Sequence, residues 1–219
     1  MKYLLTSGGI RNDNIKQKLV DLIGKPIAES SALFIPTATY AHPMAGPKAV
    51  YRSITGEDSM AALGWKSVGV LELTSLPTLS RDRWVPWVEA ADVLLVDGGD
   101  TIFLRHWMEE SGLADLLPTL DAVWVGVSAG SMVMTPRIGR EFVTWPESRG
   151  EDAALGIVDF AIFPHLEYPG WSSNTMASAE KWFANLDCPA YAIDDDTAIA
   201  VVDGKVDVIS EGLWRSFER

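Results

Sequence analysis

Short apolar runs bounded by glycine, proline or serine alternate along the chain with longer segments in which apolar positions recur every three to four residues. Such runs are typical of buried strands, and the longer segments are typical of amphipathic helices. The runs predict strands over Tyr3–Thr6, Ala32–Ile35, Ser67–Leu73, Val93–Val96, Val123–Val127 and Val158–Phe163. The longer segments predict helices over Asp13–Ile23, Pro47–Leu63, Arg81–Ala90, Thr101–Ser111, Leu113–Leu120, Ala129–Met134 and Ser172–Leu186, with Thr101 and Ser172 as N-caps.

This alternation predicts a doubly wound α/β fold, in which a mostly parallel sheet carries helices on both faces. Near the C-terminus, Ala198–Val202 and Lys205–Ile209 flank Asp203-Gly204, a dipeptide that favours a two-residue hairpin turn. We therefore expect an antiparallel hairpin at one edge of the sheet. The chain has no internal repeat and no linker rich in proline, glycine or serine, so its 219 residues predict a single domain over 1–219.

Composition and charge narrow the range of partners. The 18 basic and 30 acidic residues give a net charge of −12, which disfavours binding to nucleic acids and anionic membrane surfaces. The single cysteine, Cys188, excludes an internal disulfide and favours a reducing compartment. The first apolar run stops at Gly8, and no run approaches the ~20 apolar residues of a membrane span. We expect a cytoplasmic protein that does not bind membranes.

In a doubly wound sheet, ligands bind beyond the carboxyl ends of the strands, where loops lead into helices. Four short loops of small residues are expected at this edge. They are Ser7-Gly8-Gly9, Pro36-Thr37-Ala38-Thr39, Asp97-Gly98-Gly99-Asp100 and Ser128-Ala129-Gly130.

The sharpest motif is Gly126-Val127-Ser128-Ala129-Gly130, which follows an apolar run and precedes a predicted helix. A Gly-x-Ser-x-Gly sequence in this position is typical of a nucleophile elbow, a strained turn that projects the serine hydroxyl. The flanking glycines lack the Cβ atoms that would clash in such a turn. We expect Ser128 to be a nucleophile; the alternative is a structural glycine-rich turn or an anion-binding loop.

A nucleophilic serine needs a general base, and the chain contains three histidines. His165 follows the predicted strand Val158–Phe163 and should reach the same edge as Ser128, which favours it as the base. His106 falls inside a predicted helix, where a packing or surface position is expected. His42 is a candidate substrate contact.

The base needs a carboxylate that orients it. Asp195, in the acidic cluster Asp194-Asp195-Asp196, is the first candidate and Asp194 the second, with Glu141 and Glu147 as rivals. The order serine, histidine, acid differs from the serine, acid, histidine order of the α/β-hydrolases and argues against that fold.

The oxyanion that forms when a serine attacks a carbonyl is usually met by backbone N–H groups. Ala129, which starts the helix after the elbow, is one candidate donor. Gly99 is the other, because a glycine lets the backbone approach a substrate closely. We expect Gly98, Asp100 and Thr101 of the same loop to contact the substrate.

Together these residues resemble the ordered motifs of the peptidase E (aspartyl dipeptidase) and cyanophycinase family of serine peptidases. The matching segments are Leu4-Leu5-Thr6-Ser7-Gly8-Gly9, Gly98-Gly99-Asp100-Thr101, Gly126-Val127-Ser128-Ala129-Gly130, Pro164-His165 and Ile193-Asp194-Asp195-Asp196-Thr197-Ala198-Ile199. The resemblance implies a fold similar to class I glutamine amidotransferases, with serine in place of the elbow cysteine. It also implies Ser128 as nucleophile, His165 as base, and Gly99 and Ala129 as oxyanion donors.

The sequence departs from this family at two points. Family members often carry glutamate where this chain has Asp195. In aspartyl dipeptidases an arginine downstream of the histidine binds the substrate's aspartate, whereas here no arginine lies between Gly150 and Arg215. This second departure puts aspartyl specificity in doubt.

We therefore expect a serine peptidase of the dipeptidase type that takes small peptides and uses no metal or cofactor. The alternatives are an esterase or amidase, or a small-ligand-binding module on the same fold. Exposed tryptophans could form the surface of a homodimer.

Overall fold

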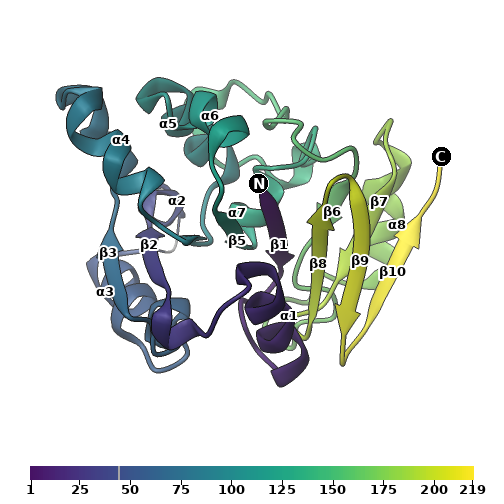
Figure 1. Cartoon of the computed structure of the whole chain (residues 1–219). Helices are drawn as coiled ribbons and strands as arrows, with labels where there is room; N and C mark the ends of the chain where they lie inside the picture. Colours follow the sequence, from purple (N-terminus) through teal and green to yellow (C-terminus); the bar gives the residue numbers. More distant parts are fainter. Residues whose placement is uncertain (44) are drawn as a thin grey trace.

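A seven-stranded, mostly parallel sheet forms the centre of the molecule (Figure 1). The computed structural model describes residues 1–43 and 45–219. Across the sheet the strands follow the order β3 (Ser67–Val70), β2 (Ser31–Ile35), β4 (Val93–Val96), β5 (Val123–Val127), β1 (Lys2–Thr6), β8 (Thr197–Val202) and β9 (Lys205–Ser210). The first five are parallel to one another, whereas β8 runs antiparallel to β1 and β9 antiparallel to β8.

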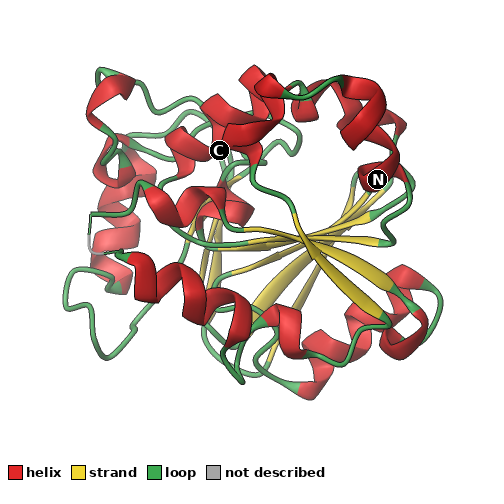
Figure 2. Ribbon diagram, turned by 90° about the vertical axis from the view of Figure 1, so that its left-hand side faces the viewer, coloured by secondary structure: helices red, strands yellow, loops and turns green. Residues whose placement is uncertain are grey.

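Helices cover both faces of this sheet, as the edge-on view in Figure 2 shows. One face carries α1 (Asp13–Ile23), α3 (Pro47–Thr55) and the 3₁₀ helix η2 (Met60–Ala62). The other carries α2 (Thr37–Tyr40), α4 (Arg81–Glu89), α5 (Thr101–Ser111), α6 (Leu113–Leu116) and α7 (Ala129–Met132). The remaining 3₁₀ helices are η1 (Ile27–Glu29), η3 (Leu73–Thr78), η4 (Leu117–Thr119), η5 (Arg140–Phe142) and η6 (Pro146–Ser148).

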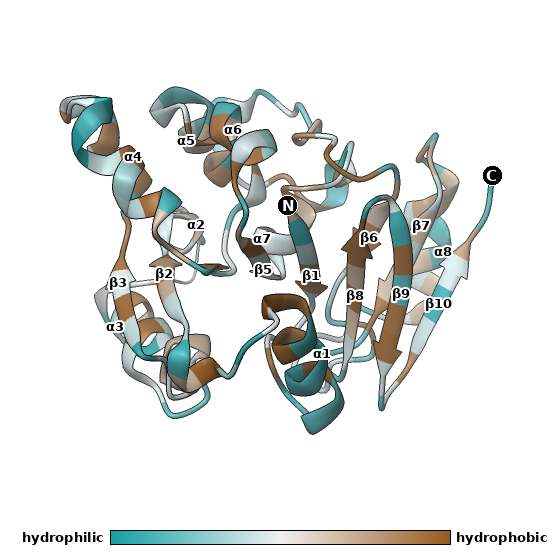
Figure 3. Ribbon diagram, viewed as in Figure 1, coloured by the Kyte–Doolittle hydropathy of each residue, from teal (hydrophilic) through white to brown (hydrophobic). Residues whose placement is uncertain are grey.

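The two-residue period of the strands divides the core between these layers. In β1, Leu4 packs with Ile15 and Leu19 of α1, whereas the next residue, Leu5, belongs to the cluster on the opposite face. Figure 3 shows the matching pattern on α1, which carries hydrophobic and hydrophilic positions on different sides. Burial of both faces explains why the parallel strands are continuous apolar runs.

A second, three-stranded sheet lies beside the large one and has its own apolar core. Its strands follow the order β10 (Trp214–Phe217), β7 (Ala190–Ile193) and β6 (Ala161–Phe163), and the helix α8 (Met176–Ala184) connects β6 to β7. Trp182 of α8 is fully buried against these strands. Residues 194–196 form the short connection from β7 of the small sheet to β8 of the large sheet.

The predicted doubly wound architecture and its C-terminal hairpin are confirmed. The hairpin turn places Asp203 and Gly204 at φ values of 50° and 73°, as a two-residue turn of this type requires. The sequence predicts a single sheet, but the strand predicted over Val158–Phe163 is shortened to β6 and belongs to the small sheet. Neither the second sheet nor its last strand, β10, was predicted.

Several predicted boundaries were wrong for local reasons. The strand predicted to extend to Leu73 ends at Val70, and the predicted helix Pro47–Leu63 ends at Thr55, just before Gly56. The N-cap of α5 is Asp100, whose carboxylate accepts the Phe103 N–H, and not Thr101. The N-cap of α8 is Thr175, which accepts the Ser178 N–H, and not Ser172.

No helix in the part of the chain that the structure describes is long and apolar enough to cross a membrane.

At Gly99, the backbone of the loop after β4 packs closely against the backbone of α2. The φ of Gly99 is +143°, and a Cβ at this position would overlap the Ala38 carbonyl group. A Cβ on the neighbouring Gly98 would lie 3.5 Å from its nearest atom, the Cβ of Ser128, which is an ordinary contact.

We predict that Gly99→Ala lowers the free energy of unfolding by about 1–3 kcal/mol, because the added methyl group must displace backbone atoms. Gly98→Ala should change it by less than about 0.5 kcal/mol. Chemical denaturation of the two variants and the wild type tests this difference. Equal stability of the two variants would show that the close approach of Gly99 is not a constraint.

Candidate active site

A cavity of about 750 Å³ opens where the carboxyl ends of β2, β4 and β5 meet the loop after β6. Ser128 and His165 both line it, although they come from different sheets. Gly98, Gly99 and Thr101, three further residues predicted for the site, also line it. Three of the four predicted loops, those that contain Thr39, Gly98 and Ser128, thus line one cavity.

Ser128 occupies a strained turn between β5 and α7. Its φ and ψ are 48° and −108°, a backbone conformation that residues other than glycine rarely adopt. A Cβ on Gly126 would overlap the Gly130 carbonyl, and a Cβ on Gly130 would overlap the Val96 carbonyl, so both positions exclude larger residues. The Ser128 N–H donates to the Thr6 carbonyl at 3.0 Å, which anchors the turn to β1. This is the geometry expected of a nucleophile elbow.

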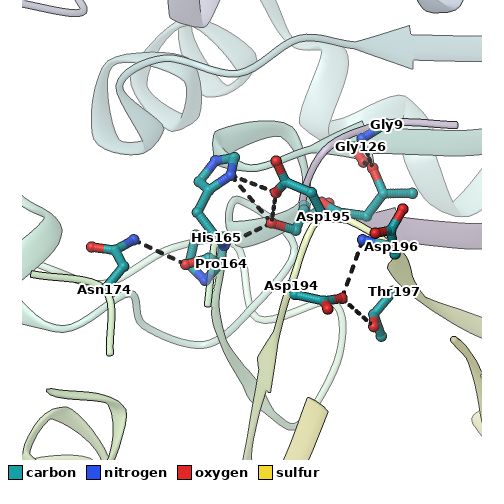
Figure 4. A network of polar contacts seen from close by, with 12 residues as sticks. Gly9, Gly126, Pro164, His165, Asn174, Asp194, Asp195, Asp196 and Thr197 are labelled. Atoms are coloured by element: carbon teal, nitrogen blue, oxygen red, sulfur yellow. Dashed lines mark hydrogen bonds and ion pairs between the residues drawn. The ribbon is translucent and has the colours of Figure 1, made fainter. Parts of the chain in front are cut away.

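His165 and Asp195 form a close pair at the end of the small sheet. The His165 Nδ1 atom lies 2.7 Å from Asp195 Oδ1, and both side chains are largely buried. Figure 4 shows the Asp195 carboxylate turned toward the His165 ring. Trp171 packs edge-on against the imidazole at a ring-centroid distance of 4.6 Å. Because Nδ1 is engaged by the carboxylate, Nε2 is the ring nitrogen left to handle a proton.

Ser7, the residue directly after β1, links this pair to the large sheet. Its hydroxyl donates to Asp195 Oδ1 at 2.7 Å and accepts the backbone N–H of His165 at 2.7 Å. The neighbouring Gly8 makes room for the acid, because a Cβ there would lie 2.7 Å from Asp195 Cβ and Cγ. Ser7 and Gly8 together therefore form a fitted contact for Asp195.

The other candidate acids have different surroundings. Asp194 faces away from the histidine in Figure 4 and accepts the Thr197 hydroxyl at 2.7 Å and the Asp196 N–H at 3.1 Å. Glu141 is exposed and lies 3.4 Å from Asn185 Nδ2, and Glu147 is exposed beside a different cavity. Within the described residues, none of these three carboxylates hydrogen-bonds to His165.

The electrostatics of Asp195 are those of a paired carboxylate. Burial alone would raise the pKa of its carboxyl group. The hydrogen bond and charge of His165, together with the Ser7 hydroxyl, outweigh burial and lower the pKa below its usual value. Asp195 is therefore held in its charged form beside the imidazole.

Two backbone donors in the cavity region are unpaired. The N–H groups of Gly99 and Ala129 have no hydrogen-bond acceptor among residues 1–43 and 45–219. Ala129 begins α7, where the first amides of a helix have no partner within the helix. Gly99 lines the cavity, and Ala129 follows Ser128 directly in the chain.

The remaining predicted substrate contacts differ in their accessibility. Asp100 is only 1% exposed, and its two oxygens accept the Phe103 N–H and the Thr144 hydroxyl, so the structure places it beneath the cavity and not on its surface. Thr101 is buried but lines the cavity, and Gly98 lines it beside Ser128.

The other two histidines lie where the sequence suggested. His42 lines the cavity. His106 lies on α5, where its ring contacts those of Trp107 and Trp145, and it lines a different cavity. Across the described residues, no group of three or more histidine, cysteine, aspartate or glutamate side chains could hold a metal ion.

Sequence reasoning placed the loops of Ser7 and Asp97 at this edge but named neither residue as part of the catalytic site. The decisive signal for Ser7 is the register of β1 with β5, in which Thr6 pairs with Val127, so that Ser7 follows at the level of Ser128. That pairing is not readable from the sequence.

Comparison with protein families shows to which family the chain belongs. The model of peptidase family S51 matches residues 3–209, which is nearly the whole chain. The chain belongs to peptidase family S51. It is therefore a peptidase of the serine type, and its substrates are peptides. No curated protein matches it.

Solved structures share its fold, among them two peptidase structures. A peptidase E candidate from Listeria monocytogenes EGD-e superposes with a TM-score of 0.72 at 19% sequence identity, covering 96% of this chain and 98% of that one. A peptidase from an acI-B1 Actinobacterium superposes with a TM-score of 0.62 at 20% identity, covering 99% of this chain and 93% of that one.

We predict that Ser7→Ala weakens the His165–Asp195 hydrogen bond, because it removes a donor to Asp195 and the acceptor of the His165 amide. A strongly hydrogen-bonded Nδ1–H proton gives a resonance far downfield in the proton NMR spectrum, which Asp195→Asn should abolish. In Ser7→Ala this resonance should move upfield or broaden through exchange with water.

Ser30→Ala is the matched control, since Ser30 is equally buried and its hydroxyl donates to the Pro26 carbonyl far from the cavity. The resonance should be unchanged in this control. An unchanged resonance in Ser7→Ala as well would show that Ser7 does not position the pair.

Proposed function

We propose that this S51 peptidase cleaves short peptides, as a dipeptidase-type enzyme, through Ser128, His165 and Asp195. The observation that carries the proposal is the 2.7 Å hydrogen bond between His165 and Asp195 in a cavity that Ser128 also lines from a strained elbow. A serine, an imidazole and a carboxylate in this arrangement are the components of nucleophilic acyl transfer.

In the proposed mechanism, the Ser128 hydroxyl oxygen attacks the carbonyl carbon of the scissile peptide bond. His165 Nε2 accepts the hydroxyl proton, while Asp195 holds the Nδ1–H and stabilises the imidazolium that forms. The imidazolium then donates that proton to the leaving amine as the C–N bond breaks. Water, activated by His165, attacks the acyl-serine ester, and the acid product and free Ser128 are released.

The oxyanion of each tetrahedral intermediate is stabilised in this mechanism by the N–H groups of Gly99 and Ala129. Both donors are backbone groups held in position by tightly packed turns, so little reorganisation accompanies the reaction. The hydroxyl of Ser128 has no hydrogen-bond partner among the described residues. It is thus free to turn toward a base or a substrate, and catalytic hydrogen bonds often form only once substrate is bound.

The size and charge of the cavity support a small substrate. A volume of about 750 Å³ lies within the range of roughly 300–1,000 Å³ that is typical of small-ligand sites. Its charged lining consists of the carboxylates Asp97 and Glu141, and no lysine or arginine is among the lining residues that the structure describes. We therefore propose that peptides with an N-terminal aspartate are poor substrates.

A fluorophosphonate probe tests the mechanism directly, because it reacts with activated serines. We predict a single adduct on Ser128 by intact mass and peptide mapping, and no adduct in Ser128→Ala or His165→Ala. Asp195→Asn should lower kcat on a dipeptide substrate by about 10³–10⁴-fold, since the imidazole loses its orienting charge.

Ser173→Ala is the control, because Ser173 is another serine lining the cavity and should not affect labelling. Labelling that persists in Ser128→Ala would refute Ser128 as the nucleophile. Hydrolysis of simple esters without any cleavage of peptides would contradict the proposed substrate class and favour an esterase.

A further inference from the structure

Asp97 is a partly buried acidic residue directly after the carboxyl end of β4. It lines the cavity that holds Ser128 and also an adjoining cavity of about 480 Å³ formed in part by Gly8 and Gly9. Asp97 therefore lies between the two cavities.

The carboxylate of Asp97 is held in place by uncharged donors. The backbone N–H of Gly98 donates to Oδ1 at 2.8 Å, and the Thr39 hydroxyl lies 2.9 Å from Oδ2. The Thr39 hydroxyl lies equally close to the Gly98 carbonyl, so its single proton is shared between two acceptors. The Ser53 hydroxyl is a third uncharged group beside the carboxylate and helps to lower its pKa. Because a carboxylate has about four acceptor positions, room remains for one further donor.

No cation neutralises this carboxylate. Within residues 1–43 and 45–219, Asp97 forms no ion pair. Arg52 lines the adjoining cavity, but it is exposed and makes no ion pair with Asp97. Burial raises the pKa of the Asp97 carboxyl group, and hydrogen bonds from its neighbours only partly offset this. A cation bound beside such a carboxylate would favour its charged form.

The position of Asp97 relative to Ser128 indicates which group that partner is. Gly98, the next residue, has its backbone beside Ser128, since a Cβ on Gly98 would lie 3.5 Å from Ser128 Cβ. Gly99, one residue further, carries an unpaired N–H and is one of the two proposed oxyanion donors. Along this one loop, the carboxylate is therefore adjacent to the place where the scissile carbonyl group would sit.

We propose that Asp97 binds the ammonium group of the substrate and is the main determinant of specificity in this cavity. This inference rests on the proposed function and deepens it. In a peptide with a free N-terminus, the α-ammonium group is two covalent bonds from the first carbonyl carbon. An ammonium group held by Asp97 would place that first peptide bond against Ser128, as the dipeptidase-type cleavage proposed above requires.

The ammonium can come from the N-terminus or from a lysine side chain, and the substrates of the test separate the two. We would compare three matched series: dipeptides with a free amino group, the same dipeptides with an acetylated N-terminus, and acetylated dipeptides that begin with lysine. The wild type should show a kcat/KM for the free dipeptides at least about 10-fold above that for both acetylated series, the factor expected of one charge-assisted hydrogen bond. A high rate on acetylated lysine peptides alone would overturn the N-terminal assignment.

Asp97→Asn keeps the shape and hydrogen-bonding capacity of the side chain but removes its charge. This variant should lose the preference for free over acetylated dipeptides, on the order of 10- to 100-fold, mainly through KM. Asp121→Asn is the matched control, because Asp121 is exposed and precedes β5, at the opposite edge of the sheet. It removes the same charge and should leave the preference intact.

Direct binding keeps the proposal separate from the mechanism. Calorimetry with Ser128→Ala, which should bind but not cleave, should show tighter binding of a free dipeptide than of its acetylated form even if Asp97→Asn fails to fold. Equal affinity for the two, or an unchanged preference in folded Asp97→Asn, would overturn the role of Asp97. Absence of fluorophosphonate labelling would instead count against the proposed catalytic function.

Discussion

The hydrogen-bonded contact between Ser7, Asp195 and His165 is the interaction on which the candidate active site depends. The nucleophile belongs to the large sheet, whereas the histidine follows β6 of the small sheet and the acid lies in the connection between the two. Without a fixed contact between these sheets, the imidazole would have no defined position relative to Ser128. Ser7 supplies that contact from β1, the strand paired with β5, and the absence of a side chain at Gly8 lets the acid approach.

On the other side of the site, close backbone packing maintains the strained conformation of Ser128. The left-handed conformation of Ser128 is retained because Gly126 and Gly130 allow β5, α7 and the end of β4 to approach one another. Gly99 plays the same part for the loop after β4. Conformations of this kind persist only where the surroundings determine them, and they cluster at functional sites. In our proposal, this packing holds the unpaired amides of Gly99 and Ala129 in position to stabilise the oxyanion.

Much of the large sheet was predictable, because strands buried on both faces are continuous apolar runs and the elbow motif marks the end of β5. The small sheet was not, since β6, β7 and β10 are short and their partners are distant in sequence. Distance in sequence also limited the prediction of the candidate site. Ser128 and His165 could be selected from a motif and a count of three histidines, but four acids remained. Only tertiary structure separates Asp195 from Asp194, its neighbour, which binds Thr197 and the adjacent turn instead.

The central claim is that Ser128, the His165–Asp195 pair and the two unpaired amides act on one carbonyl group. A crystal structure of the protein with a phosphonate covalently bound to Ser128 tests it most directly, because the phosphoryl oxygen imitates the oxyanion. We expect this oxygen to accept hydrogen bonds from the N–H groups of both Gly99 and Ala129, with His165 Nε2 facing the adduct. A phosphoryl oxygen directed into solvent, or an imidazole turned away from the adduct, would contradict it.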